Sequence, residues 1–168
     1  FHGNFESGGA MEEKIDTFAT WSWVFSLQYM NQMERLLREH DVTVAQFTVL
    51  HHVTKPALRS GTTLSEVSAS VEVNLPAVVK IINKFEKLGL VETEILTKRG
   101  RSRSVMATPR AQIALDAMKK SMGPFLHDLF SSLSAEDEEH VVRAMKLMAE
   151  RMYRLRSTGS EDDKTKRE

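Results

Sequence analysis

The sequence predicts a mainly α-helical protein with a small two- or three-stranded β-wing: a winged helix-turn-helix domain flanked by long dimerisation helices. Two short helical segments, 64–71 and 74–88, are separated by only a few residues, as in a helix-turn-helix. A basic hairpin pattern follows between residues 91 and 107. Long helical segments with apolar stripes precede and follow this central part. These three observations together predict the fold class.

The first long helix is expected between Asp16 and His40, a stretch without proline or glycine. Its apolar residues recur every three or four positions, which places them on one face of a helix. They are Phe18, Trp21, Phe25, Tyr29, Met33 and Leu36. Such a stripe must be covered by another surface, so this helix is not expected to stand alone.

Two capping boxes predict the next two helix starts. Thr43 is followed three residues later by Gln46, and Thr63 by Glu66, so each side-chain pair can bond the free amides of a first helical turn. The helix after Thr43 should end before Pro56. The helix after Thr63 should be barely two turns long.

The second helix of the helix-turn-helix should begin at Asn74, a favourable N-cap, with Pro76 tolerated in the first turn. Its two faces differ in character. The apolar positions are Val78, Ile81, Ile82, Phe85 and Leu88. The opposite positions are Lys80, Asn83, Lys84 and Lys87. One face should pack in the core, while the other is basic.

The hairpin should consist of strands at 91–96 and 103–107, with Gly100 at a charged tip. From Lys80 to Arg110 the chain carries eight bases against three acids, although its 23 basic and 23 acidic residues balance overall. The bases are Lys80, Lys84, Lys87, Lys98, Arg99, Arg101, Arg103 and Arg110. Positive charge concentrated on a helix and a hairpin is typical of a surface that meets a phosphate backbone.

The C-terminal part should form two more helices between residues 109 and 155. Thr108-Pro109 begins the first, and Ser134 restarts the chain after Gly123-Pro124. We expect dimerisation helices at about 16–40 and 109–155 and a DNA-binding lobe at about 43–108, within one regulator spanning 11–156. The apolar stripes of the terminal helices predict a homodimer. Residues 1–10 are interpreted as a leader that was added in cloning or is disordered, and 157–168 as a disordered tail.

Several classes of function are excluded by absent motifs. The chain has no cysteine, no run of about 18 apolar residues, no glycine-rich cofactor loop, and no HExxH or GxSxG motif. We therefore expect no enzyme, no cofactor, no metal site and no membrane association, and a cytoplasmic location. Adjacent His51 and His52 point about 100° apart on a helix, which disfavours a shared metal ion.

The order of these motifs resembles the MarR family of bacterial transcriptional regulators over most of the chain, from about Phe18 to Leu155. The resemblance is carried by 43–47 (TVAQF), 64–67 (LSEV), 85–91 (FEKLGLV), an arginine-rich wing and 107–109 (ATP). It implies a dimer that binds a pseudo-palindromic operator in double-stranded DNA, represses nearby genes, and releases DNA when a small aromatic or phenolic effector binds. The family's wing-tip arginine corresponds to Arg101, but Arg99 stands where the family usually has aspartate.

The sequence nominates two sets of site residues. The DNA-binding set is Asn74, Leu75, Ala77, Lys80, Lys84, Lys98, Arg99, Arg101 and Arg103. The effector-binding set is Tyr29, Phe47 and His51. Alternatives remain open: the lysines also fit a solvated helix face, the aromatic residues also fit core or dimer packing, and the winged helix also fits a protein-interaction module without specific DNA binding.

Overall fold

The computed structural model describes residues 6–96 and 102–165, with side chains described within 9–96 and 102–155. The chain divides into two compact units, Phe1–Met122 and Gly123–Glu168. The first unit contains α1 (Glu6–Arg38), α2 (Val44–Val53), the 3₁₀ helix η1 (Pro56–Leu58), β1 (Thr62–Thr63), α3 (Leu64–Val71), α4 (Leu75–Lys87), β2 (Val91–Ile95), β3 (Arg103–Ala107) and most of α5 (Pro109–Ser131). The second contains the end of α5 and α6 (Ala135–Thr165). The predicted fold class, mainly helical with a small β-wing, is confirmed.

Helix α1 begins earlier than the sequence analysis expected. It starts at Glu6 rather than near Asp16, so residues 6–10 of the predicted leader are helical. The residues between Ala10 and Ile15 are mostly good helix formers, and an isolated glycine such as Gly9 costs a helix only about 1 kcal/mol relative to alanine. A continuous helix therefore extends through this segment.

Both predicted capping boxes are present. Thr43 Oγ1 accepts a hydrogen bond from the Gln46 amide at 3.2 Å, and Gln46 Oε1 accepts from the Thr43 amide at 3.3 Å. Thr63 and Glu66 form the equivalent pair at the start of α3, with distances of 3.2 and 2.8 Å. Each box satisfies amides that have no partner within the helix, which fixes where α2 and α3 begin.

The sheet has three antiparallel strands in the order β1-β3-β2. In β2 and β3, Val91 is opposite Ala107 and Ile95 is opposite Arg103, while Thr62 of β1 is opposite Val105. The two-residue β1 strand is followed at once by α3. Glu66 Oε2 accepts hydrogen bonds from the hydroxyls of Thr62 and Thr63, each at 2.9 Å, so one carboxylate joins the edge strand to the helix.

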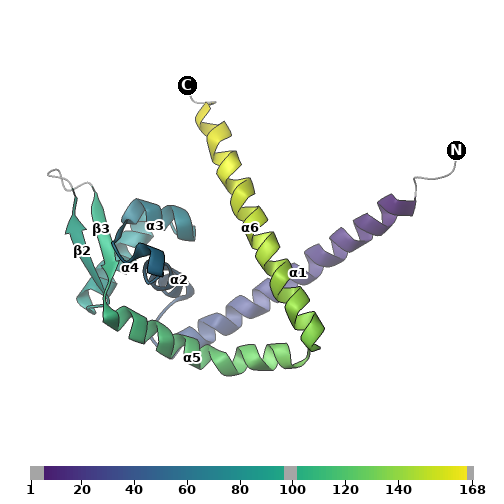
Figure 1. The fold of residues 1–168 in the computed structure, drawn as a ribbon, viewed down its shortest axis with the longest axis horizontal. Coiled ribbons are helices and arrows are strands. Elements are labelled where there is room, and N and C mark those ends of the chain that lie inside the picture. The colour runs from purple at the N-terminus through teal and green to yellow at the C-terminus, as the bar shows by residue number, and fades with distance from the viewer. Residues whose placement is uncertain (1–5, 97–101, 166–168) are drawn as a thin grey trace. The chain divides into compact units, whose positions relative to one another are not determined.

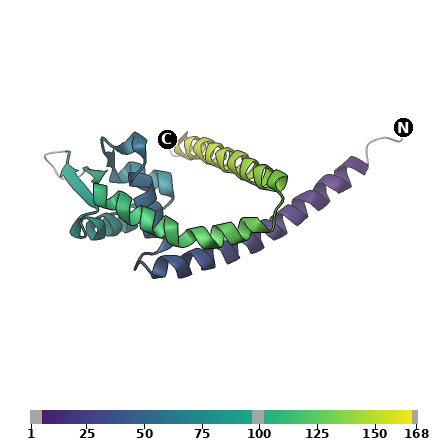
Figure 2. The same ribbon diagram turned by 60° about the horizontal axis from the view of Figure 1, so that its bottom comes forward.

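The buried centre of the first unit lies among α2, α3, α4 and the sheet. Figure 1 and Figure 2 both show these helices gathered beside the hairpin of β2 and β3. The largest fully buried side chains include Phe85 and Ile82 of α4 and Leu50 of α2, each no more than 1 % exposed. Glu72, with φ of 57°, ends α3 in the left-handed conformation, and the chain then turns into α4. The helix-turn-helix is thus built on its own apolar core.

Helix α5 starts where the Thr108-Pro109 motif predicts. Thr108 Oγ1 donates to the carbonyl of Gly89 at 2.8 Å, which fastens this junction to the end of α4. Leu115 and Met118 of α5 are buried, whereas Ile113 is 70 % exposed. In a helix, Ile113 lies about 160° away from Leu115 and Ala111, on the opposite side from the buried face.

The second unit is described by its own contacts. Ser134 Oγ accepts a hydrogen bond from the Asp137 amide at 3.1 Å, in agreement with the predicted restart at Ser134. Helix α6 continues to Thr165, whereas the sequence analysis expected a disordered tail from residue 157. No proline follows Pro124, so nothing in the sequence forces this helix to end earlier.

Candidate nucleic-acid interface

Helix α4 separates an apolar face from a basic one. Val78, Ile82 and Phe85 are almost completely buried. About half a turn away around the helix, Lys80 and Lys87 are exposed and Asn83 lies half-buried between them. Lys80, Asn83, Lys84, Lys87 and Leu88 line an open groove of about 440 Å³. The helix therefore offers two lysines and one amide on the side that faces away from the core.

The predicted residues at the start of α4 have different surroundings. Asn74 caps the helix, because its Oδ1 accepts a hydrogen bond from the Ala77 amide at 3.0 Å. Leu75 is exposed, and Ala77 is half-buried. The side-chain oxygen of Asn74 therefore accepts a hydrogen bond from the helix, and the side-chain NH₂ group is left for other contacts.

Lys84 is held by the protein itself. Its ammonium group donates to the Asp41 carbonyl and to Gln46 Oε1, both at 3.0 Å. Asp41 lies in the turn between α1 and α2, and Gln46 belongs to the capping box of α2. Lys84 thus ties the flank of α4 to the start of α2. The sequence pattern nominated Lys84 as a DNA-binding residue and gave no sign of these two partners.

Arg103 is also bound within the protein, on the opposite flank of α4. Its Nη1 donates to Asn83 Oδ1 at 2.9 Å, and its Nη2 donates to Thr93 Oγ1 at 2.8 Å and to Glu86 Oε2 at 3.1 Å. The Thr93 hydroxyl donates to Glu86 as well. These four side chains, which we call the Arg103 cluster, join β2 and β3 to α4. The guanidinium charge is paired with a carboxylate, which differs from the expected free phosphate contact.

The remaining predicted wing residues are Lys98, Arg99 and Arg101, which lie outside the described residues. On the described part of the wing, Ile95 and Leu96 are 65 % and 51 % exposed. Asn83 and Lys87 were placed on the basic face by the sequence analysis but were not nominated as site residues. The spacing Lys80, Asn83, Lys87 along one face is the signal that could have identified them.

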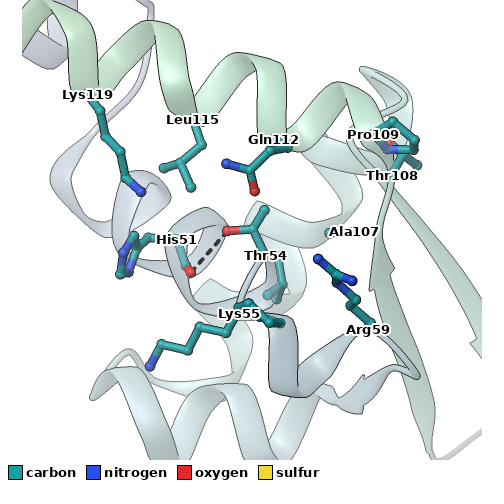
Figure 3. A pocket seen from close by; sticks show the side chains of 12 residues that line it. His51, Thr54, Lys55, Arg59, Ala107, Thr108, Pro109, Gln112, Leu115 and Lys119 are labelled. Atoms are coloured by element: carbon teal, nitrogen blue, oxygen red, sulfur yellow. Dashed lines mark hydrogen bonds between the residues drawn. The ribbon is translucent and has the colours of Figure 1, made fainter.

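A cavity of about 550 Å³ lies in the first unit, between α2, η1 and the start of α5. Figure 3 shows Gln112 and Lys119 extending from α5 and the Arg59 guanidinium reaching up from beyond η1. The lining includes four basic side chains and no carboxylate. These side chains are His51, Lys55, Arg59 and Lys119. Such a lining favours an anion.

The histidines near this cavity are biased toward their neutral form. Burial lowers the pKa of His51, and the nearby charges of Lys119 and Lys55 lower it further. The pKa of His52 is also lowered, by burial and then by Lys55 and His51. Of the three predicted effector residues, only His51 lines the cavity. Phe47 stacks on the His51 ring with centroids 6.0 Å apart, while Tyr29 stacks on Phe25 along α1.

The described residues offer neither a membrane span nor a cluster of metal ligands. No helix between residues 6–96 or 102–165 is both long and apolar enough to pass through a membrane. Within the same ranges, no three or more histidine, aspartate or glutamate side chains are grouped so that they could hold a metal ion.

Solved structures with the same fold are transcription regulators of the MarR type. No protein-family model and no curated protein matches the sequence. MepR of Staphylococcus aureus, a transcription regulator of the multidrug efflux pump MepA, is 16 % identical, with a TM-score of 0.63 over 80 % of this chain and 98 % of that chain. MepR in complex with DNA gives the same TM-score and identity over 80 % and 97 %. Apo MarR of Escherichia coli is 18 % identical, with a TM-score of 0.63 over 77 % and 95 %.

Proposed function

Starting from the MarR-type winged-helix fold of this chain, we propose that the protein is a homodimeric, sequence-specific double-stranded DNA-binding regulator of transcription that acts as a repressor. The observation that carries the proposal is the outward face of α4, where Lys80, Asn83 and Lys87 stand beside a wing. A helix of this kind fits the major groove, and its lysines can neutralise phosphates. One structural neighbour, MepR, is known as a DNA complex, which supports the same use of the fold.

The dimer is proposed from exposed apolar side chains on the terminal helices. Trp21 and Phe18 of α1 are 67 % and 54 % exposed, and Met145 and Met152 of α6 are 50 % and 72 % exposed. Val141, Met145, Met148 and Met152 fall on one face of α6. A second copy would cover these surfaces and would place two α4 helices for the half-sites of a pseudo-palindromic operator.

The cavity beside His51 is proposed as the site of a small effector that releases the DNA. Its basic side chains favour a compound that carries negative charge, and the family resemblance suggests that this compound is aromatic or phenolic. An anion there would stabilise the protonated form of His51 and so raise its lowered pKa. The effector could weaken DNA binding only if it bound more tightly to a conformation that does not fit the operator.

The DNA-binding proposal is tested by fluorescence anisotropy with labelled duplexes from the region upstream of the gene. We expect selective binding whose logarithmic affinity falls with the logarithm of salt concentration, by about 0.9 for each neutralised phosphate. Lys80→Ala and Lys87→Ala should each weaken binding and reduce this slope by about 1 per half-site. Lys120→Ala, which removes an exposed lysine from α5, is the matched control.

Two results would contradict the proposal. One is the absence of selective, salt-dependent binding to any upstream duplex. The other is full biological function in a Lys80→Glu, Lys87→Glu double variant, which would instead support a winged helix used only for protein contacts. The effector proposal has a separate readout, because ligand binding at the cavity can be followed from the histidine NMR signal of His51 without DNA.

A further inference from the structure

We propose that Arg103 fixes the orientation of the Asn83 amide, so that α4 presents hydrogen-bond donors, and no acceptor, from this position to the DNA bases. The inference rests on the proposed DNA-binding function and adds to it a specificity-determining residue, Asn83, with Arg103 as its positioning residue. The sequence pattern places Asn83 on the outward face of α4 but does not show what orients its amide, and in that pattern Arg103 was one more cation of the wing.

The side-chain amide of Asn83 has a defined direction. Arg103 Nη1 lies 2.9 Å from Asn83 Oδ1. A guanidinium group has only donors, so an asparagine bonded to it must turn its oxygen toward the arginine. The Asn83 NH₂ group therefore points away from Arg103, and no hydrogen bond from it occurs within the described residues. Asn83 also lines the groove between the two exposed lysines of α4.

Arg103 is itself held in place by further hydrogen bonds. Glu86 and Thr93 both accept from its Nη2, and the Thr93 hydroxyl donates back to Glu86. Ile95 is directly opposite Arg103 in the β2–β3 ladder, so Arg103 and Thr93 project from the same face of the sheet toward α4. Arg103 is only about one quarter exposed. An arginine with three partners and little exposure cannot swing away to free the Asn83 oxygen without breaking the Arg103 cluster.

The orientation of the Asn83 amide determines which DNA bases it can recognise. Asparagine reads adenine by pairing its oxygen with N6 and its NH₂ with N7, which requires both groups. With the oxygen turned toward Arg103, the NH₂ group is the part of the Asn83 amide left for a base. In the major groove its possible partners are then N7 and O6 of guanine, N7 of adenine and O4 of thymine, and among these bases guanine alone offers two adjacent acceptors. The Arg103 cluster thus predicts a preference for guanine over adenine, and discrimination against cytosine, at one symmetry-related pair of operator positions.

The experiment is selection of bound sequences from a pool of randomised duplexes, followed by anisotropy titrations with single-base substitutions of the selected duplex. We expect wild-type protein to prefer guanine at one pair of positions. Asn83→Ala should erase that preference and weaken binding of the selected duplex about fivefold per half-site, at the lower end for a specific base contact. Arg103→Met should let the amide rotate, so that adenine becomes the preferred base at the same positions while other positions keep their preference.

Two further variants separate this role from simple support of the wing. Arg110→Met removes one positive charge from the same unit without touching Asn83, and should change affinity equally for all sequences. Asn83→Asp keeps an oxygen for Arg103 and replaces the donor NH₂ with an acceptor. We expect it to shift the preference toward bases that donate in the major groove, cytosine or adenine. This variant retains the partner of Arg103, so it tests the inference even if Arg103→Met unfolds.

The outcomes are distinguishable. If wild-type protein selects a sequence but Asn83→Ala and Asn83→Asp leave every base preference unchanged, the inference is overturned and the proposed function stands. If Arg103→Met remains folded and lowers affinity equally for all bases, Arg103 supports the wing alone and the inference is again overturned. If wild-type protein selects no sequence, the proposed function itself fails.

Discussion

The winged-helix lobe (42–108) and the terminal helices use their apolar residues in opposite ways. In the lobe, Phe85, Leu50 and Val105 are no more than 1 % exposed. On the terminal helices, Trp21 of α1 and Met152 of α6 are 67 % and 72 % exposed. Among the described side chains, every buried apolar residue lies between Met33 and Met122. The difference indicates that the lobe, together with the adjoining ends of α1 and α5, has a core of its own, whereas the exposed apolar residues of α1 and α6 need a covering surface.

The largest expected effect tests the lobe side of the comparison. Phe85→Ala should lower the free energy of unfolding by about 3–5 kcal/mol, because it removes a fully buried ring and leaves a cavity. Trp23→Ala removes a larger ring that is 75 % exposed and lies off the α1 stripe, and should change the free energy by no more than about 0.5 kcal/mol. Urea denaturation followed by circular dichroism measures both. Equal losses would mean that burial in the described chain does not determine where stability resides.

The next largest effect tests the terminal helices. A Met145→Glu, Met152→Glu double variant places charges on the apolar stripe of α6 and should weaken dimerisation at least about 100-fold, since each side chain loses roughly 1.5 kcal/mol or more of burial. Sedimentation equilibrium gives the association constant. Arg143→Glu changes charge on the opposite face of α6 and is the matched control. A double variant that dimerises as tightly as the wild type would exclude α6 from the interface.

A smaller effect compares two glycines. Gly61 has φ of 97°, and a Cβ there would lie 2.7 Å from Ser104 Oγ and 3.1 Å from Met106 Cγ. Gly61→Ala should therefore destabilise the lobe by about 1–2 kcal/mol, the cost of a left-handed conformation for a residue with a side chain. Gly9→Ala is the control, since Gly9 lies within α1 and a Cβ there meets no atom within 4 Å. A thermal melt in which the two variants shift equally would contradict the assigned strain.

The smallest expected effect is a dependence of stability on pH that belongs to the first unit. Burial and neighbouring lysines lower the pKa of His51, so the unfolded chain binds more protons than the folded chain below about pH 6.5. Stability should therefore fall as the pH drops through 6.5 toward the lowered folded pKa of His51. Denaturation midpoints at pH 7.5 and 5.5 measure this difference, and a His51→Gln, His52→Gln variant should reduce it. A larger midpoint at pH 5.5 would reverse the assigned direction.

Much of the fold was predictable because its signals are local. The capping boxes at Thr43 and Thr63 use residues three positions apart, and the faces of α4 follow from one helical period. The strand β1 was harder to predict, because two residues are too few to show alternation and Thr63 also serves as the N-cap of α3. The start of α1 and the end of α6 were predicted wrongly, because the composition of these segments was taken as evidence against a helix. No proline in either segment required the helix to end there.

The site was less predictable because its partners are distant in the sequence. A pattern shows that Lys84 and Arg103 are cationic, but it does not show which acceptors meet them. Lys84 bonds to residues 38 and 43 positions away, and Arg103 bonds to Asn83, 20 positions away. These contacts make two predicted DNA-binding residues into internal braces as well. They also reveal Asn83, which carries no charge and was therefore passed over, as a candidate base reader.

The Glu66 carboxylate at the junction of β1 and α3 has a consequence for how the lobe opens. Glu66 Oε2 accepts hydrogen bonds from the Thr62 hydroxyl and from the hydroxyl and backbone amide of Thr63. Strand β1 is in turn paired to β3. Peeling the edge strand away therefore removes the cap of α3 at the same moment. Amide hydrogen exchange in the first turn of α3 and along β3 should report a single cooperative event, so that the edge of the sheet and the first helix of the helix-turn-helix behave as one unit of local unfolding.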